Sequence, residues 1–350
     1  MMRLPKKSRL WTGFAGAVVM GMLAGCSGAG EKTTEAMQLM QELDYRAALT
    51  ELQTAEEAGE NARLIARGQG IAYMGLADYE HAISCFEEAL RSSDGFVQPV
   101  DYDINYYLAA AYAKNGQLAE AENIYSAILD LKTDEEAFFL RGTVRLEQNE
   151  YENAKADFDR VIAMDGTDYD RIIQIYQSLD TYGYKEVGRQ YLNQCLEANG
   201  SKMNPYDMGR MYYYLGEYEQ AYMILEKAKA KGDANTYLYL GKAYEATGDY
   251  NYASSVYNSW LAKDTSNAEI YNQLGLCEMQ KGNYQSALNA FQTGMKIEDN
   301  PVMQALAFNE IVAYENMEEY AQAATLMEQY LKSYPDDLQA KREYDFLKTR

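Results

Sequence analysis

One histidine and several adjacent acidic pairs are the residues of this chain that could perform acid–base chemistry. His81 stands beside Asp78 and Glu80, and an imidazole acts as a general base only where a nucleophile and an orienting partner lie within hydrogen-bond reach. The neighbouring sequence supplies neither. Adjacent carboxylates such as Glu318 and Glu319 point apart on a helix, which indicates a solvated surface. Since no phosphate loop, nucleophile elbow or zinc motif accompanies them, the sequence predicts no enzyme, cofactor or metal site.

The cysteines divide into two kinds. Cys85, Cys195 and Cys277 lack the spacing of metal ligands, and we expect them to be buried thiols, because free cysteine behaves as a small apolar residue. Cys26 is different, because it closes an uncharged apolar run from Leu10 to Gly25. That run is too short for a comfortable membrane span, and it has the layout of a secretory signal. The basic residues that precede it are Arg3, Lys6, Lys7 and Arg9.

The end of this run, Leu23-Ala24-Gly25-Cys26, resembles the signal of bacterial lipoproteins. The resemblance implies that residues 1–25 are removed and that Cys26 is lipidated. Residues 26–34 would then be a short tether, and the protein would be extracytoplasmic and anchored to the cell membrane, or to the outer membrane if the cell has one. Ordinary secretory cleavage after Ala29 is the alternative.

A small residue, alanine or glycine, recurs at a nearly constant spacing along the chain and indicates its repeating structural units. Its steps are 32 to 39 residues, close to 34 in most cases. A repeat of this length is typical of a solenoid of stacked supersecondary units. The series is Ala48, Ala82, Ala121, Ala154, Gly188, Ala221, Ala253, Ala287 and Ala323.

Each unit reads as two helices joined by a tight turn. In the eighth repeat Asn267 can cap the first helix, and Gly282 can end it, because glycine adopts the left-handed conformation at little cost. Gly275 would let the second helix approach the first, and Ala287 would let the next repeat approach. In the fifth repeat Gly188 follows Tyr184 by four residues instead of three, which leaves open an extra turn residue or a slipped register.

The seventh repeat shows a pattern that resembles the tetratricopeptide repeat, in Leu240, Gly241, Tyr244, Gly248, Tyr250, Ala253 and Tyr257. The resemblance implies an all-α, right-handed α-solenoid of about nine helix-turn-helix units over residues 35–335. Residues 336–350 would add a C-terminal capping helix, with Leu338, Tyr344 and Leu347 toward its neighbour. It also implies that the first helices line a concave surface.

The chain has 53 acidic and 32 basic residues and a formal net charge of -21. This charge opposes binding to nucleic acid and to anionic lipid headgroups, and it would favour a basic partner or simple solubility.

Projecting the repeat register onto the concave side gives the predicted ligand groove. Its residues are Tyr106, Phe139, Tyr206, Arg210, Tyr213 and Lys242. Aromatic residues and arginine are common anchors of protein interfaces. We therefore expect a membrane-anchored scaffold that binds an envelope protein or an extended peptide segment in this groove, and Arg210 with Lys242 could grip a carboxylate. The alternatives are cell-wall glycan binding and a structural role in envelope assembly.

Overall fold

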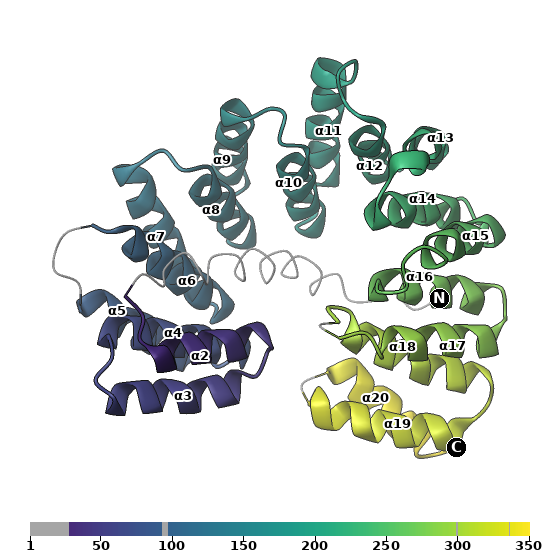
Figure 1. Cartoon of the computed structure of the whole chain (residues 1–350). Coiled ribbons are helices and arrows are strands. Elements are labelled where there is room, and N and C mark those ends of the chain that lie inside the picture. The colour runs from purple at the N-terminus through teal and green to yellow at the C-terminus, as the bar shows by residue number, and fades with distance from the viewer. Residues whose placement is uncertain (1–27, 93–96, 299, 336) are drawn as a thin grey trace. The chain divides into compact units, whose positions relative to one another are not determined.

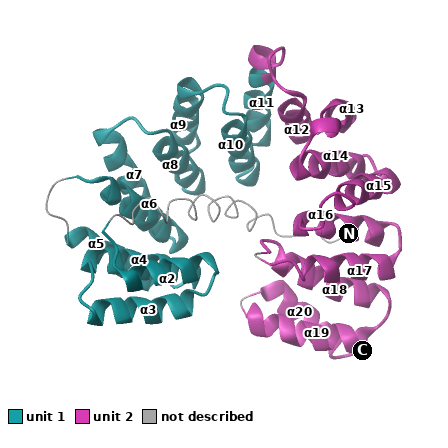
Figure 2. Ribbon diagram, viewed as in Figure 1, with its two compact units in different colours: residues 1–195 teal, residues 196–350 magenta. Residues whose placement is uncertain are grey.

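The computed structural model describes residues 28–92, 97–298, 300–335 and 337–350. These residues form α-helices joined by short turns, with one 3-10 turn, and they divide into two compact units, residues 1–195 and 196–350 (Figure 2). Cys26 lies outside the described residues.

The first unit contains five pairs of helices (Figure 1). They are α2 (Glu31–Gln41) with α3 (Tyr45–Glu57), α4 (Ala62–Gly75) with α5 (Tyr79–Arg91), α6 (Pro99–Lys114) with α7 (Leu118–Leu131), α8 (Glu135–Glu147) with α9 (Tyr151–Met164), and α10 (Tyr169–Thr181) with α11 (Lys185–Asn199), whose last turn crosses the unit boundary.

The second unit contains four pairs and a final single helix. They are α12 (Pro205–Leu215) with α13 (Tyr218–Ala228) and the 3-10 turn η2 (Lys229–Lys231), α14 (Ala234–Ala246) with α15 (Tyr250–Leu261), α16 (Ala268–Gln280) with α17 (Tyr284–Gly294), α18 (Met303–Asn316) with α19 (Tyr320–Ser333), and α20 (Leu338–Leu347). In the described part of the chain this confirms the predicted all-α solenoid of nine helix pairs with a terminal cap.

The turn inside each pair has one conformation throughout. The residue two places before each second helix has a positive φ, which lets the backbone reverse and return hydrogen bonds to the first helix. In the third repeat the Gly116 N–H donates to the Ala113 carbonyl at 3.1 Å, and the Gln117 N–H donates to the Tyr112 carbonyl at 2.8 Å. The nine residues are Leu43, Ala77, Gly116, Asn149, Gly183, Gly216, Gly248, Gly282 and Glu318.

This turn also settles the register of the fifth repeat. Gly183 has φ 92° and α11 begins at Lys185, three residues before Gly188. Lys185 therefore takes the position that tyrosine holds in most other repeats, and Tyr184 lies in the turn. The turn contains no extra residue.

Glycines in the first helices set the distance to the second helices. A Cβ built on Gly275 would lie 2.2 Å from the ring of Phe291, and one built on Gly241 would lie 2.3 Å from the ring of Tyr257. Each aromatic residue follows its glycine by sixteen positions. The predicted role of Gly275 is therefore confirmed, and Ala287 is fully buried as expected.

The start of α2 is held by a side chain from the turn before α4. The Glu60 carboxylate accepts from the Lys32 and Thr33 backbone N–H groups, both at 2.9 Å, and from the Thr33 hydroxyl at 2.7 Å. These bonds satisfy N–H groups that a helix N-terminus leaves without partners. Ordered helix thus begins at Glu31, inside the segment 26–34 for which the sequence suggested a tether.

Candidate ligand-binding face

Four of the predicted groove residues come together on the first helices of the second unit. Tyr206, Arg210 and Tyr213 project from α12, and Lys242 projects from α14. Tyr239 of α14 joins them: its ring centroid lies 6.2 Å from that of Tyr206 and 5.6 Å from that of Tyr213, both in edge-to-face geometry. Such pairs are the favoured arrangement of aromatic rings. We call these five residues, together with Tyr214, the tyrosine cluster.

Arg210 is held inside this cluster. Its guanidinium carbon lies 5.0 Å from the ring centroid of Tyr206 and 5.3 Å from that of Tyr239, within the range of cation–π attraction. Its Nη1 lies 3.5 Å from a carboxylate oxygen of Asp207, and only 8% of the residue is exposed. Its charge is balanced within the protein.

Lys242 is similarly engaged. Its Nζ donates to a Glu269 carboxylate oxygen at 2.9 Å, which connects α14 to α16, and it lies 5.8 Å from the Tyr239 ring centroid. The two cations of the cluster therefore meet the two carboxylates of Asp207 and Glu269. The cluster offers a ligand tyrosine surface more than positive charge.

Two tyrosine hydroxyls of the cluster bond to each other. Tyr214 and Tyr239 place their hydroxyl oxygens 2.9 Å apart, and burial, followed by the neighbouring Tyr239, raises the pKa of Tyr214. The Tyr214 hydroxyl thus stays protonated near neutral pH. Tyr206, Tyr213 and Tyr239 remain partly exposed.

Tyr106 and Phe139 lie in the first unit, on α6 and α8. The Tyr106 hydroxyl donates to Asp134 at 2.6 Å, and burial together with this carboxylate raises its pKa. The Phe139 ring lies 4.4 Å from the guanidinium carbon of Arg171. Both side chains therefore help to join successive repeats, and each remains partly exposed.

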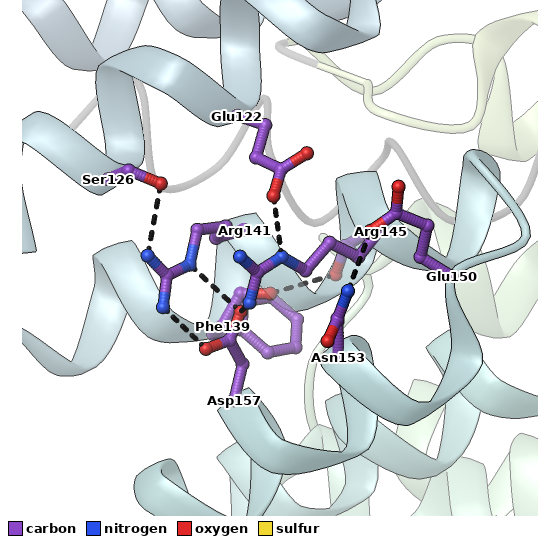
Figure 3. A network of polar contacts seen from close by, with 9 residues as sticks. Glu122, Ser126, Phe139, Arg141, Arg145, Glu150, Asn153 and Asp157 are labelled. Carbon is purple, nitrogen blue, oxygen red and sulfur yellow. Dashed lines mark hydrogen bonds and ion pairs between the residues drawn. The ribbon is translucent and has the colours of Figure 1, made fainter.

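In the first unit, a network of ion pairs and hydrogen bonds connects the helices α7, α8 and α9 (Figure 3). Asp157 of α9 accepts from Arg141 at 2.7 and 3.0 Å and from Arg145 at 2.9 Å. Arg141 also donates to Ser126 at 3.0 Å, and Arg145 donates to Glu122 at 2.8 Å, both on α7. Because the Asp157 side chain is only 4% exposed and its charge is compensated, the network stabilises the packing of two repeats.

His81 lies in an exposed position at the start of α5. Its Nδ1 is 2.8 Å from a carboxylate oxygen of Asp78, and its ring stacks on Tyr73 with centroids 5.2 Å apart. The Asp78 carboxylate also accepts from the His81 backbone N–H at 3.3 Å, as the N-cap of the helix. His81 and Asp78 therefore belong to the N-terminal cap of α5 at the protein surface.

Sequence reasoning missed Tyr239 and the carboxylates that neutralise the cluster. On α14 the projected register selects Lys242, and Tyr239, three positions earlier, was not included in the predicted groove. Its distance of 33 residues from Tyr206, about one repeat, is the signal that could have found it.

None of the helices in the described ranges has both the length and the apolar character that crossing a bilayer requires.

Comparison with known proteins places these repeats among tetratricopeptide repeats. One tetratricopeptide-repeat profile matches residues 67–136 and 238–297, and two others match 135–168 and 305–337. Together they cover more than half of the chain.

Two curated relatives match part of the chain. BBSome complex member bbs-4 of Caenorhabditis elegans is 26% identical over 189 residues, which are 50% of this chain and 40% of that protein. BBSome complex member BBS4 of Bos taurus is 28% identical over 120 residues, 34% of this chain and 23% of that protein. The chain thus spans less than half the length of either relative.

Solved structures of repeat proteins are also similar. A tetratricopeptide repeat protein from Parabacteroides merdae has a TM-score of 0.45 and 15% identity, covering 71% of this chain and 99% of that one. YrrB, described as a TPR protein with an unusual peptide-binding site, has a TM-score of 0.37 and 20% identity, covering 54% and 97%.

Proposed function

This chain belongs to the tetratricopeptide-repeat family, a fold of protein-interaction scaffolds, and from that premise we propose that it is an extracytoplasmic, lipid-anchored scaffold. Its ligand would be an extended segment of an envelope protein, bound across the first helices α12 and α14. The observation that carries the proposal is the tyrosine cluster, in which two successive first helices present partly exposed rings side by side.

The chemistry of the cluster suits a peptide. Tyrosine rings supply a large contact area at a small cost in conformational entropy, and the packing of Tyr206 and Tyr213 against Tyr239 fixes these rings before a ligand arrives. Such pre-organisation reduces the entropy that binding must lose. With Arg210 and Lys242 already paired, aromatic contact would contribute more than ion pairing with a ligand carboxylate.

A binding experiment tests this face. The protein spanning residues 27–350 is immobilised, and envelope proteins are captured with and without the paired substitutions Tyr206→Ala and Tyr213→Ala. The loss of two aromatic anchors should weaken a partner's affinity roughly 30- to 1,000-fold, at about 1–2 kcal/mol for each anchor. Tyr252→Ala is the matched control, because Tyr252 of α15 is 44% exposed and lies outside the cluster.

Equal capture by all three proteins would contradict the proposed face. Circular dichroism and a thermal melt should show that each variant keeps its helices. Retention on purified wall polymer, lost in the paired variant while no protein is captured, would instead support glycan binding, since partly exposed tyrosine rings can also stack on sugars.

The proposed anchor has its own test. Cys26→Ala should release the protein from the membrane fraction, and metabolic labelling with a fatty acid should mark the parent and not the variant. A single acyl chain binds membranes only marginally, so stable anchoring needs more than one. Equal membrane association of parent and variant would contradict lipidation at Cys26.

A further inference from the structure

Glu315 near the end of α18 is a carboxylate in an unfavourable position. Its Oε1 is buried and accepts no hydrogen bond from the described residues. A buried carboxylate oxygen without a donor loses its hydration and gains nothing in exchange, which disfavours the ionised form.

The equivalent position in an earlier repeat shows what is missing. Glu245 of α14 stands eight residues before Ala253, as Glu315 stands eight before Ala323. Glu245 accepts a hydrogen bond from the hydroxyl of Tyr257, twelve residues later. Twelve residues after Glu315 the chain has Met327, which is fully buried and carries no donor. The last repeat thus keeps the glutamate and lacks the hydroxyl that satisfies it.

A second carboxylate acts on Glu315 from the capping helix. Burial, followed by the negative charge of Glu343 on α20, raises the pKa of Glu315 to about 7. In the described part of the chain Lys341 and Arg342, the cations of α20, form no ion pair with Glu315, and Lys348, just after α20, pairs with Asp345 at 2.7 Å.

The capping helix itself is lightly held. Only Ala340 and Leu347 of its ten residues are buried, and they pack against the core of α18 and α19 at the yellow end of the chain in Figure 1. A small electrostatic change can therefore alter how firmly α20 docks.

We infer that α20 is a pH-responsive cap, docked firmly when Glu315 is protonated and loosened when Glu315 and Glu343 are both ionised. Glu245 is contacted by Cys277 of the following first helix, α16, and the buried Leu347 of α20 stands at the same spacing of 32 residues from Glu315. By this equivalence α20 covers Glu315. When α20 leaves, Glu315 regains water and loses the charge of Glu343, so its carboxyl ionises at a lower pH than in the docked state. Docking is therefore strongest below about pH 4.5, weakens as the pH rises toward 7, and is constant above that. Loosening would expose the apolar end of the α18–α19 pair.

Hydrogen exchange of the α20 backbone amides, normalised for the intrinsic pH dependence of exchange, measures this docking. Between pH 5 and pH 8 the population of opened α20 should rise roughly 10- to 100-fold, after allowance for the partial exposure of Glu315. Amides of α4 and α5 should show no such change and so report on the rest of the fold.

Three variants identify the responsible group. Glu315→Gln should abolish the pH dependence, and Glu343→Gln should keep it but move its midpoint to lower pH. Glu328→Gln is the matched control, because Glu328 is a glutamate of α19 with a 56% exposed side chain. A pH dependence that survives in Glu315→Gln, or its absence in the parent protein, would overturn the inference.

Discussion

Replacing Ala77 by glycine should stabilise the protein, because Ala77 has φ 58° in the turn between α4 and α5. An L-residue in the left-handed region costs about 1–2 kcal/mol. Glycine removes that cost but loses more backbone entropy on folding, about 0.5–1 kcal/mol. Since the Ala77 side chain is exposed and little packing is lost, we expect a net stabilisation of about 0.5–1 kcal/mol.

Two matched substitutions bracket this expectation. Gly116 occupies the same turn position with φ 80°, and a Cβ built there has no atom within 4 Å, so Gly116→Ala isolates the backbone term and should destabilise by about 0.5–1 kcal/mol. Ala58 is exposed at the end of α3 with φ -76°. Ala58→Gly relieves no strain and should also destabilise, by roughly 0.5–1 kcal/mol.

The assay is urea unfolding followed by helical circular dichroism, with hydrogen exchange of α4 and α5 to localise the effect, because repeat proteins can unfold in parts. An unchanged denaturant slope shows that the unfolded state has not altered. If Ala77→Gly lowers the stability as Ala58→Gly does, then the left-handed turn does not strain the chain, and the argument from the positive φ is wrong.

Two further substitutions test the packing between helices. Gly275→Ala forces a methyl group against the Phe291 ring, and such overpacking should lower the free energy of unfolding in urea by about 1–3 kcal/mol. A loss below about 0.5 kcal/mol would show that the ring moves freely. Asp157→Asn leaves Arg141 and Arg145 without their shared carboxylate, so it should lower the free energy of unfolding by about 3–5 kcal/mol. The control is Asp159→Asn, because Asp159 forms an exposed pair with Lys155; it should lower the free energy of unfolding by less than about 1 kcal/mol. Equal losses for the two aspartates would refute the role given to the buried network.

The helix pairs were predictable because their signals are local and repeat. A small residue every 34 positions or so, and a glycine that can end the first helix, both lie within one repeat. The fifth repeat was ambiguous only because tyrosine moved into the turn. The conformation of Gly183 resolved that ambiguity, and a backbone conformation cannot be read from composition.

The state of the candidate site was less predictable, because its decisive contacts join different repeats. Lys242 forms an ion pair with Glu269, 27 residues later, and Arg210 makes a cation–π contact with Tyr239, 29 residues later. A projected register identifies which residues lie on a face, and Tyr206, Arg210 and Tyr213 on α12 lie close to Tyr239. It does not show which charged side chains already form an ion pair with a neighbouring repeat.

The contacts between successive first helices of the first unit differ from those between α12 and α14, and this difference bears on where a ligand would bind. In the first unit, arginine and carboxylate pairs connect successive first helices: Arg67 with Asp103, and Arg171 with Glu135 at 2.9 Å. A ligand that used these groups would have to separate them, and breaking a buried pair leaves an uncompensated charge. In the second unit the corresponding contacts of Tyr206 and Tyr239 are between aromatic rings, which can add a further ring or aliphatic group at a free edge or face without losing the contact they have. For this physical reason, and not because of its charge, the tyrosine cluster is the face on which we expect a partner to dock.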